Sequence, residues 1–116
     1  MSVSYSEFLD SLSPEQLGVF LYLDKIFLEI EGVTRKMRYR VPFYDYGQWI
    51  CYINPKPDNK AELCFLDSKL LIKDFPLLQS KERKRVAGLP LDAEEDLDKA
   101  LILDIFHAAR PLQRDS

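Results

Sequence analysis

The hydrophobic pattern of the chain changes its period at Gly32, and this change constrains the fold more than any other feature. Before it, Ser13, Pro14 and Gln16 form a helix start with a capping box, and apolar residues then recur at helical spacing. After it, residues 33–41 alternate with a period of two, which is typical of a half-buried strand, and Pro42 is expected to end this strand. The sequence therefore predicts a long helix followed directly by a sheet.

Shorter patterns complete the predicted order of elements. Ser4 and Glu7 form a second capping box, which predicts a short helical turn within residues 4–12. Further strands are expected at 49–53, 61–66, 69–73 and 85–89, and a last amphipathic helix is expected from Asp92 to Arg110-Pro111. This order indicates an α+β two-layer sandwich, an antiparallel sheet of about five strands with N- and C-terminal helices packed on one face. The other face is expected to meet solvent or a partner.

Length and composition fit a single domain over residues 1–116. Its core is expected at about residues 13–110, and the tail at 111–116 is expected to fray. A net charge of -3 gives the domain no general attraction to nucleic acid or to an anionic membrane. The N-terminus has no leader pattern, charged residues interrupt every apolar stretch, and there is no disulfide framework. These features predict a cytoplasmic protein that is not inserted in a membrane.

The two cysteines lie in the strands on either side of the polar loop at residues 54–59. A hairpin symmetric about this loop places Cys51 directly opposite Cys64, with Cβ atoms close enough for a disulfide or a shared ligand. A register change of one residue would send one cysteine to the other face, and free cysteines in strands are mostly small core residues. Two separate buried thiols are therefore the main expectation, and a pair is the alternative.

Basic and aromatic residues alternate between the first predicted strand and the second. The candidate ligand-binding residues in this segment are Arg38, Arg40, Phe43, Tyr44 and Trp49. Basic grooves with aromatic platforms suit an anionic ligand or single-stranded nucleic acid. Alternating Lys and Arg residues are also ordinary on a solvated sheet face, and the net negative charge disfavours nucleic acid.

The densest group of carboxylates lies at the start of the last predicted helix. It consists of Asp92, Glu94, Glu95, Asp96 and Asp98. Carboxylate oxygens suit iron or another hard cation, which makes this group the candidate metal site. Helix starts are commonly acidic because the helix dipole stabilises negative charge there, so a structural role is favoured and no cofactor is the main expectation.

No catalytic residue is predicted from the sequence. His107 is the only histidine, and nothing around it has the spacing of a catalytic triad. The four glycines are isolated, so there is no glycine-rich loop to hold a phosphate group. These observations favour a binding protein over an enzyme.

The segment Lys-Met-Arg-Tyr-Arg-Val-Pro-Phe-Tyr at residues 36–44 resembles the basic–aromatic–x–x–Pro–aromatic signature of the YdhG-like family, a bacterial domain of unknown function. A turn glycine (Gly47), a strand pair, a Leu-rich link and a C-terminal helix follow, and the similarity covers about residues 17–110. Arg40 stands where many members have glycine. The resemblance implies a frataxin-like arrangement of two helices over an antiparallel sheet, and some members are linked to frataxin-like iron handling. Frataxins bind iron through acidic residues near the first helix, and that acidic ridge is not reproduced here.

The functional expectation is a small, non-enzymatic domain of the YdhG-like type that binds a small molecule or a protein. Binding is expected on the open sheet face and along residues 38–49. A frataxin-like iron-binding or iron-chaperone protein is the alternative. Binding of an anionic ligand or of single-stranded nucleic acid through the basic aromatic face is a third, less favoured hypothesis.

Overall fold

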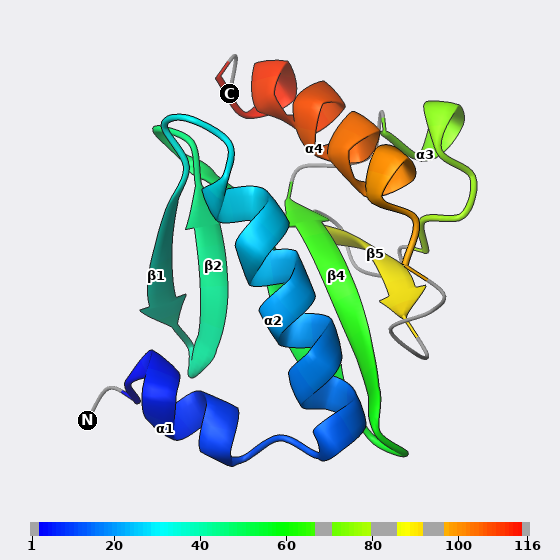
Figure 1. The fold of residues 1–116 in the computed structure, drawn as a ribbon. Coiled ribbons are helices and arrows are strands. Elements are labelled where there is room, and N and C mark those ends of the chain that lie inside the picture. Colours follow the sequence, from blue (N-terminus) through cyan, green and yellow to red (C-terminus); the bar gives the residue numbers. More distant parts are fainter. Residues whose placement is uncertain (1–2, 67–70, 80–85, 92–96, 115–116) are drawn as a thin grey trace.

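The computed structural model describes residues 3–66, 71–79, 86–91 and 97–114 (Figure 1). Its helices are α1 (Tyr5–Asp10), α2 (Pro14–Leu28), α3 (Leu71–Asp74) and α4 (Lys99–Arg114). Its strands are β1 (Thr34–Arg38), β2 (Val41–Asp45), β3 (Trp49–Lys56), β4 (Lys60–Leu66) and β5 (Val86–Leu91). The strands form one antiparallel sheet in the order β1-β2-β3-β4-β5, which confirms the predicted α+β class with a five-stranded sheet.

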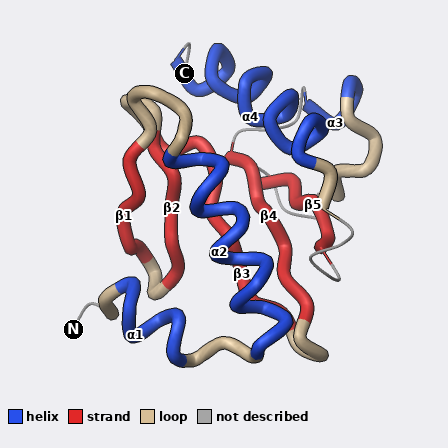
Figure 2. Tube along the Cα trace, viewed as in Figure 1, coloured by secondary structure: helices blue, strands red, loops and turns tan. Residues whose placement is uncertain are grey.

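The long helices α2 and α4 lie on the same face of the sheet. Phe27 of α2 contacts Phe106 of α4, with ring centroids 5.2 Å apart, and α2 crosses in front of β3 and β4 (Figure 2). Beneath the helices, Cys51, Ile53 and Leu63 point into the main core and are fully buried. The described residues place no such helical layer on the opposite face of the sheet, and we call it the open face.

Both predicted capping boxes begin helices. The Ser4 hydroxyl accepts from the Glu7 backbone N–H (3.1 Å), and the Ser13 hydroxyl accepts from the Gln16 N–H (3.2 Å). The Gln16 side chain also donates to the carbonyl oxygens of Lys56 (3.0 Å) and Lys60 (2.9 Å). The residue that caps α2 therefore also ties its first turn to the hairpin between β3 and β4.

The single strand predicted at residues 33–41 is in fact a tight hairpin. Arg38 pairs with Val41 across a two-residue loop, in which Tyr39 and Arg40 have φ angles of 53° and 67°. Pro42, expected to end the strand, lies inside β2 opposite Met37. The Arg38–Val41 pair beside the two-residue loop exchanges backbone hydrogen bonds, and the next pair, Met37–Pro42, does not. Residue 42 therefore needs no backbone N–H to pair with β1, and proline is tolerated there.

Two other segments differ from the prediction. Residues 71–74 form a short helix instead of a strand, because a pattern this short does not distinguish a strand from a helical turn. The α4 helix continues beyond Arg110-Pro111 to Arg114, so the expected frayed tail at 111–116 is helical through residue 114. The strand predicted at 85–89 corresponds to β5, and the helix start predicted at Asp92 lies outside the described residues.

The two cysteines are not opposite one another. Lys56 pairs with Lys60 across residues 57–59, which places Cys51 opposite Phe65, and Cys64 opposite Tyr52. This register differs by one residue from the symmetric hairpin, and strand neighbours face opposite sides, so the thiols lie on different faces of the sheet. Both cysteines are free and buried, and burial raises the pKa of the Cys51 thiol. The alternative of a cysteine pair was wrong.

None of the helices in the described part of the chain is long and apolar enough to cross a membrane.

Candidate binding site on the open face of the sheet

A β-bulge brings Trp49 to the open face. Tyr44 pairs with Cys51, but the next residue, Asp45, pairs with Trp49, so Ile50 is an extra residue in β3. Ile50 and Cys51 consequently both point into the core and are 1% and 0% exposed. The side chain of Trp49 points to the other side, where it is 41% exposed. Without the bulge, strand alternation would direct Trp49 into the core.

Four aromatic side chains meet on the open face. Phe43 lies at their centre, with ring centroids 4.8 Å from Tyr52, 5.3 Å from Trp49 and 6.0 Å from Tyr39. Phe43 and Tyr52 are stacked, whereas Trp49 meets Phe43 and Tyr39 edge-on. Phe43 is 3% exposed and lies outside the main core cluster, so its burial is due to this second set of contacts. We call these four residues the aromatic cluster.

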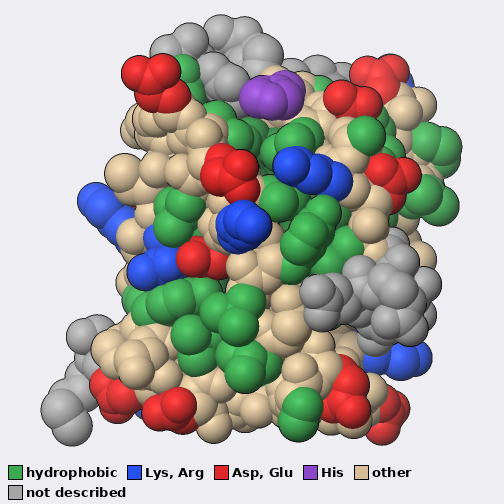
Figure 3. Space-filling model, viewed as in Figure 1, with side chains coloured by type: hydrophobic (Ala, Val, Ile, Leu, Met, Phe, Trp, Pro, Cys, Tyr) green, Lys and Arg blue, Asp and Glu red, His purple; other side chains and the backbone are tan. Residues whose placement is uncertain are grey.

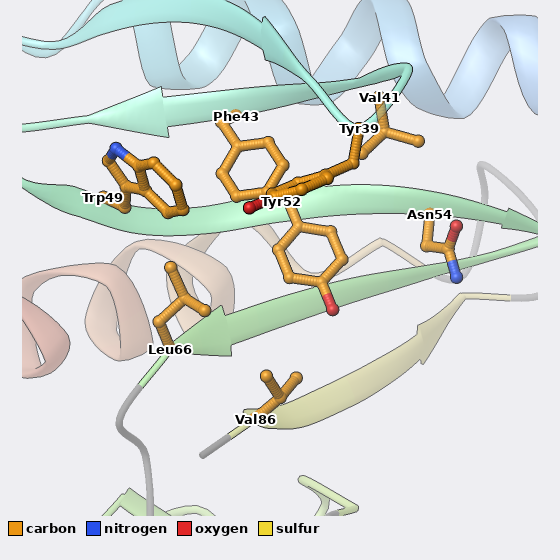
Figure 4. A pocket seen from close by; sticks show the side chains of 8 residues that line it. All are labelled: Tyr39, Val41, Phe43, Trp49, Tyr52, Asn54, Leu66 and Val86. Atoms are coloured by element: carbon orange, nitrogen blue, oxygen red, sulfur yellow. The ribbon is translucent and has the colours of Figure 1, made fainter. Parts of the chain in front are cut away.

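The aromatic cluster borders a hollow of about 390 Å³ on the open face (Figure 4). Its described lining consists of Tyr39, Val41, Phe43, Trp49, Tyr52, Asn54, Leu66 and Val86. Figure 4 shows Tyr39 extending from the β1–β2 turn back over the sheet, beside Phe43 and Tyr52. The lining is mostly apolar, with two phenols and one amide, and its volume is in the usual range for small-molecule sites.

Arg38 supports this site but is already paired. Its guanidinium donates two hydrogen bonds to the Asp45 carboxylate (2.8 and 2.7 Å), a bidentate arrangement that neutralises the charge. The same guanidinium lies 4.3 Å from the centroid of the Trp49 ring and 5.5 Å from that of Phe43. Arg38 therefore holds Trp49 in place by cation–π contact.

Of the other predicted ligand-binding residues, Arg40 lies beside the site and Tyr44 does not. Arg40 is exposed in the β1–β2 turn, next to Tyr39. Tyr44 faces the helices, is fully buried, and donates from its hydroxyl to Oδ1 of Asp24 (2.8 Å). The structure thus brings together Arg38, Arg40, Phe43 and Trp49, and places Tyr44 on the opposite face.

Tyr44 belongs to a polar network beneath α1. Nη1 of Arg35 donates to both oxygens of Asp24 (2.7 and 2.9 Å), and its guanidinium lies 3.7 Å from the centroid of the Tyr5 ring. Burial, together with the negative charge of Asp24, raises the pKa of the Tyr5 phenol to about 12. Burial and the same carboxylate also raise the pKa of Tyr44 well above its usual value of 10.0. Both phenols stay protonated where free tyrosines ionise.

These pKa shifts predict a loss of stability at alkaline pH. In the unfolded chain the phenols release protons near pH 10, whereas folded Tyr5 holds its proton to about pH 12 and Tyr44 higher still. Above pH 10 the folded state therefore binds more protons than the unfolded state, and in such a range stability falls as the pH rises. The stability that the two phenols contribute is present below pH 10 and declines above it. Urea unfolding at a series of pH values should show this decline, and Tyr44→Phe should make it shallower. An equal slope in the variant would contradict the assignment to Tyr44.

The predicted metal residues fall mostly outside the described part of the chain, because Asp92, Glu94, Glu95 and Asp96 lie in residues 92–96. Asp98 is described, and its carboxylate accepts from the Leu101 backbone N–H (3.1 Å) at the start of α4. Within the described residues, no three His, Cys, Asp or Glu side chains are grouped to hold a metal ion. Acidic side chains on the helix-covered face lie in several small groups, many of them near the edges of the view (Figure 3).

Comparison with known proteins adds no relative to this picture. No protein-family model matches the chain, and neither the curated proteins nor the solved structures give a significant match. The resemblance to the YdhG-like family stays a prediction.

Sequence reasoning missed Tyr39 and Tyr52 as site residues. The single strand predicted at residues 33–41 places Tyr39 on the same face as Met37, whereas residues 39–40 in fact form a turn. Tyr52 carried a usable signal: alternation along β3 places it opposite to Cys51 and Ile53, and Phe43 is its partner in β2. The bulge at Ile50 has no comparable signature in the sequence.

Proposed function

We propose that this chain is a small, non-enzymatic binding domain that holds an apolar, ring-bearing group of a ligand or partner on its open sheet face. The observation that carries the proposal is the aromatic cluster around a hollow of about 390 Å³. Aromatic rings supply large apolar area and favourable edge or stacking contacts, and the amide and phenols can orient a bound group.

The conformation of Tyr39 supports a binding role. Its side chain is 80% exposed, so it adds little to the core, and its φ of 53° is unfavourable for a bulky residue. Backbone strain of this kind costs about 1–3 kcal/mol and is concentrated at functional sites. Its contacts in the fold are with Phe43 and Trp49 of the aromatic cluster, and a binding site gains a projecting ring.

The chemistry of the lining favours binding over catalysis. The described lining residues include no carboxylate, imidazole or thiol that could act as a general base or nucleophile. Cys51 and Cys64 are buried, and His107 lies on α4, which packs on the other face. A pocket of this composition is suited to holding a ligand without transforming it.

The proposal extends to the type of domain. Two long helices on one face of a five-stranded antiparallel sheet are compatible with the frataxin-like arrangement expected of a YdhG-like, cytoplasmic protein. The iron alternative would rest on carboxylates at residues 92–96, and nothing in the described residues favours it.

The test is a fragment screen read by two signals from the same site. Trp49 is the only tryptophan, so its fluorescence reports on the hollow directly, and amide chemical shifts locate the bound fragment. Aromatic fragments should shift the amides of β2 and β3 around Phe43 and Tyr52. Tyr39→Ser should weaken their binding by about tenfold, as expected for one lost ring contact.

The matched control removes an exposed apolar side chain from the opposite face. Leu21 of α2 is 46% exposed, so Leu21→Ser should leave fragment binding unchanged. The proposal fails if fragments shift only amides away from the open face, or if Tyr39→Ser and Leu21→Ser behave alike.

A further inference from the structure

We infer that the ligand of this site is a planar aromatic ring carrying a doubly charged anionic group, with the size and chemistry of a nucleoside monophosphate. The inference rests on the proposed binding function and names its ligand class. It follows from the juxtaposition of the aromatic cluster with two exposed cations that have no ion-pair partner among the described residues, Lys36 and Arg40.

The aromatic cluster suits a flat ring. Trp49 presents its edge to Phe43 and Tyr39, at interplanar angles of 70° and 76°, so the walls of the hollow meet nearly at right angles. A flat ring in such a corner can stack on one wall and meet the edge of the other, which are the favoured geometries of aromatic pairs. The Asn54 amide in the lining offers both a donor and acceptors, which suits the polar edge of a heterocycle.

Lys36 and Arg40 supply the positive charge. Lys36 is directly opposite Phe43, which is opposite Tyr52, so these three residues form one row across the open face. Arg40 follows Tyr39, a lining residue of the hollow, in the β1–β2 turn. Cations carried by residues next to the lining of an apolar hollow match an anion attached to an apolar ring.

Most other charges nearby are compensated or buried, and Lys56 and Lys60 lie farther along the same face, at the end of the β3–β4 hairpin. Arg38 is bound to Asp45, and Arg35 is bound to Asp24 on the opposite face. Glu62 points to the open face but is 1% exposed, and its side chain lies over Gly88. Exposed charge beside the hollow is therefore positive within the described residues, although the chain as a whole carries a net charge of -3.

A single nucleotide fits better than a nucleic acid strand. A strand-binding groove neutralises a series of phosphates with many Lys and Arg side chains, whereas the described lining of this hollow contains none, and Lys36, Arg40 and Lys56 lie near its lining residues. Its volume of about 390 Å³ is also at the lower end of the range for small-molecule sites. Both observations favour one ring and one anionic group.

The experiment titrates the full chain with the four ribonucleoside monophosphates, the matching nucleosides, inorganic phosphate and a ten-residue oligothymidylate, using Trp49 fluorescence and calorimetry. At least one monophosphate should bind about tenfold more tightly than its nucleoside, because two charge-assisted contacts are added. Lys36→Gln/Arg40→Gln should remove this difference and leave nucleoside binding intact. Lys25→Gln/Lys73→Gln, the same charge change at exposed helix positions, should not affect it.

The outcomes separate the two proposals. Equal binding of nucleoside and monophosphate, or no effect of Lys36→Gln/Arg40→Gln, overturns the anionic class while the aromatic site stands. If ring-bearing fragments bind and no nucleotide does, the anionic class is likewise overturned and the aromatic site stands. Tighter binding of the oligothymidylate than of any monophosphate overturns the single-nucleotide ligand in favour of a strand. Absence of any ligand at Trp49 removes both proposals.

Discussion

Replacing Asp24 with alanine is expected to lower the free energy of unfolding by about 3 kcal/mol. The Asp24 carboxylate accepts from Arg35 (2.7 and 2.9 Å) and from the Tyr44 hydroxyl (2.8 Å), and its side chain is 16% exposed. Its removal leaves a buried phenol without its acceptor and the Arg35 guanidinium without its counter-charge. Urea unfolding of the variant and the parent chain measures the difference.

The loss should be largest near α1. The Arg35 guanidinium packs on the Tyr5 ring, so a displaced Arg35 should increase hydrogen exchange of the α1 amides. Glu29→Ala removes an exposed carboxylate from the C-terminal end of the same helix and should change stability by less than about 0.5 kcal/mol. If Asp24→Ala costs no more than this control, the network is only a surface ion pair.

The double variant Tyr39→Asn/Arg40→Gly is expected to be more stable than the parent chain and to bind ligand poorly. Tyr39 and Arg40 both have positive φ, the combination that a type I′ turn requires and that Asn-Gly adopts most readily. Relief of the strain should add about 1 kcal/mol, after allowance for the greater freedom of glycine in the unfolded chain. Loss of the Tyr39 ring should weaken fragment binding by about tenfold or more.

The turn between β3 and β4 provides the comparison. Asn59 also has positive φ (65°), but asparagine tolerates this conformation, so Asn59→Gly should stabilise the chain much less and should not affect binding. Thermal unfolding and fluorescence titration of the same samples measure both properties. Unchanged or lower stability of the double variant would show that the β1–β2 turn carries no strain.

Much of the architecture could be predicted because its signals are local. Ser13, Pro14 and Gln16 specify the start of α2 through side chains that reach only three residues. The change of period at Gly32 likewise marked the start of the sheet, and its β1 residues alternate as expected. Such features are encoded within one turn of helix or a few strand residues.

The binding site was harder to predict because it depends on two irregular features. The sequence Tyr39-Arg40 lacks the glycine or asparagine that normally indicates a two-residue turn, so the hairpin was read as one strand and Pro42 as its end. Tyr44 was included because aromatic residues in one segment were taken together, although neighbours in a strand face opposite sides. Tertiary pairing, which a single sequence does not display, determined both outcomes.

The bulge at Ile50 makes the site separable from the fold. Because of one extra residue, Ile50 and Cys51 both point into the core, while Trp49 points to the open face. If β3 kept Ile50 but ran without the bulge, strand alternation would turn the tryptophan to the inside and dismantle the aromatic cluster, while the rest of β3 kept its pairing with β4. The backbone conformation at one residue therefore decides whether this recognition surface exists, while the sheet and the helices that support it stay the same.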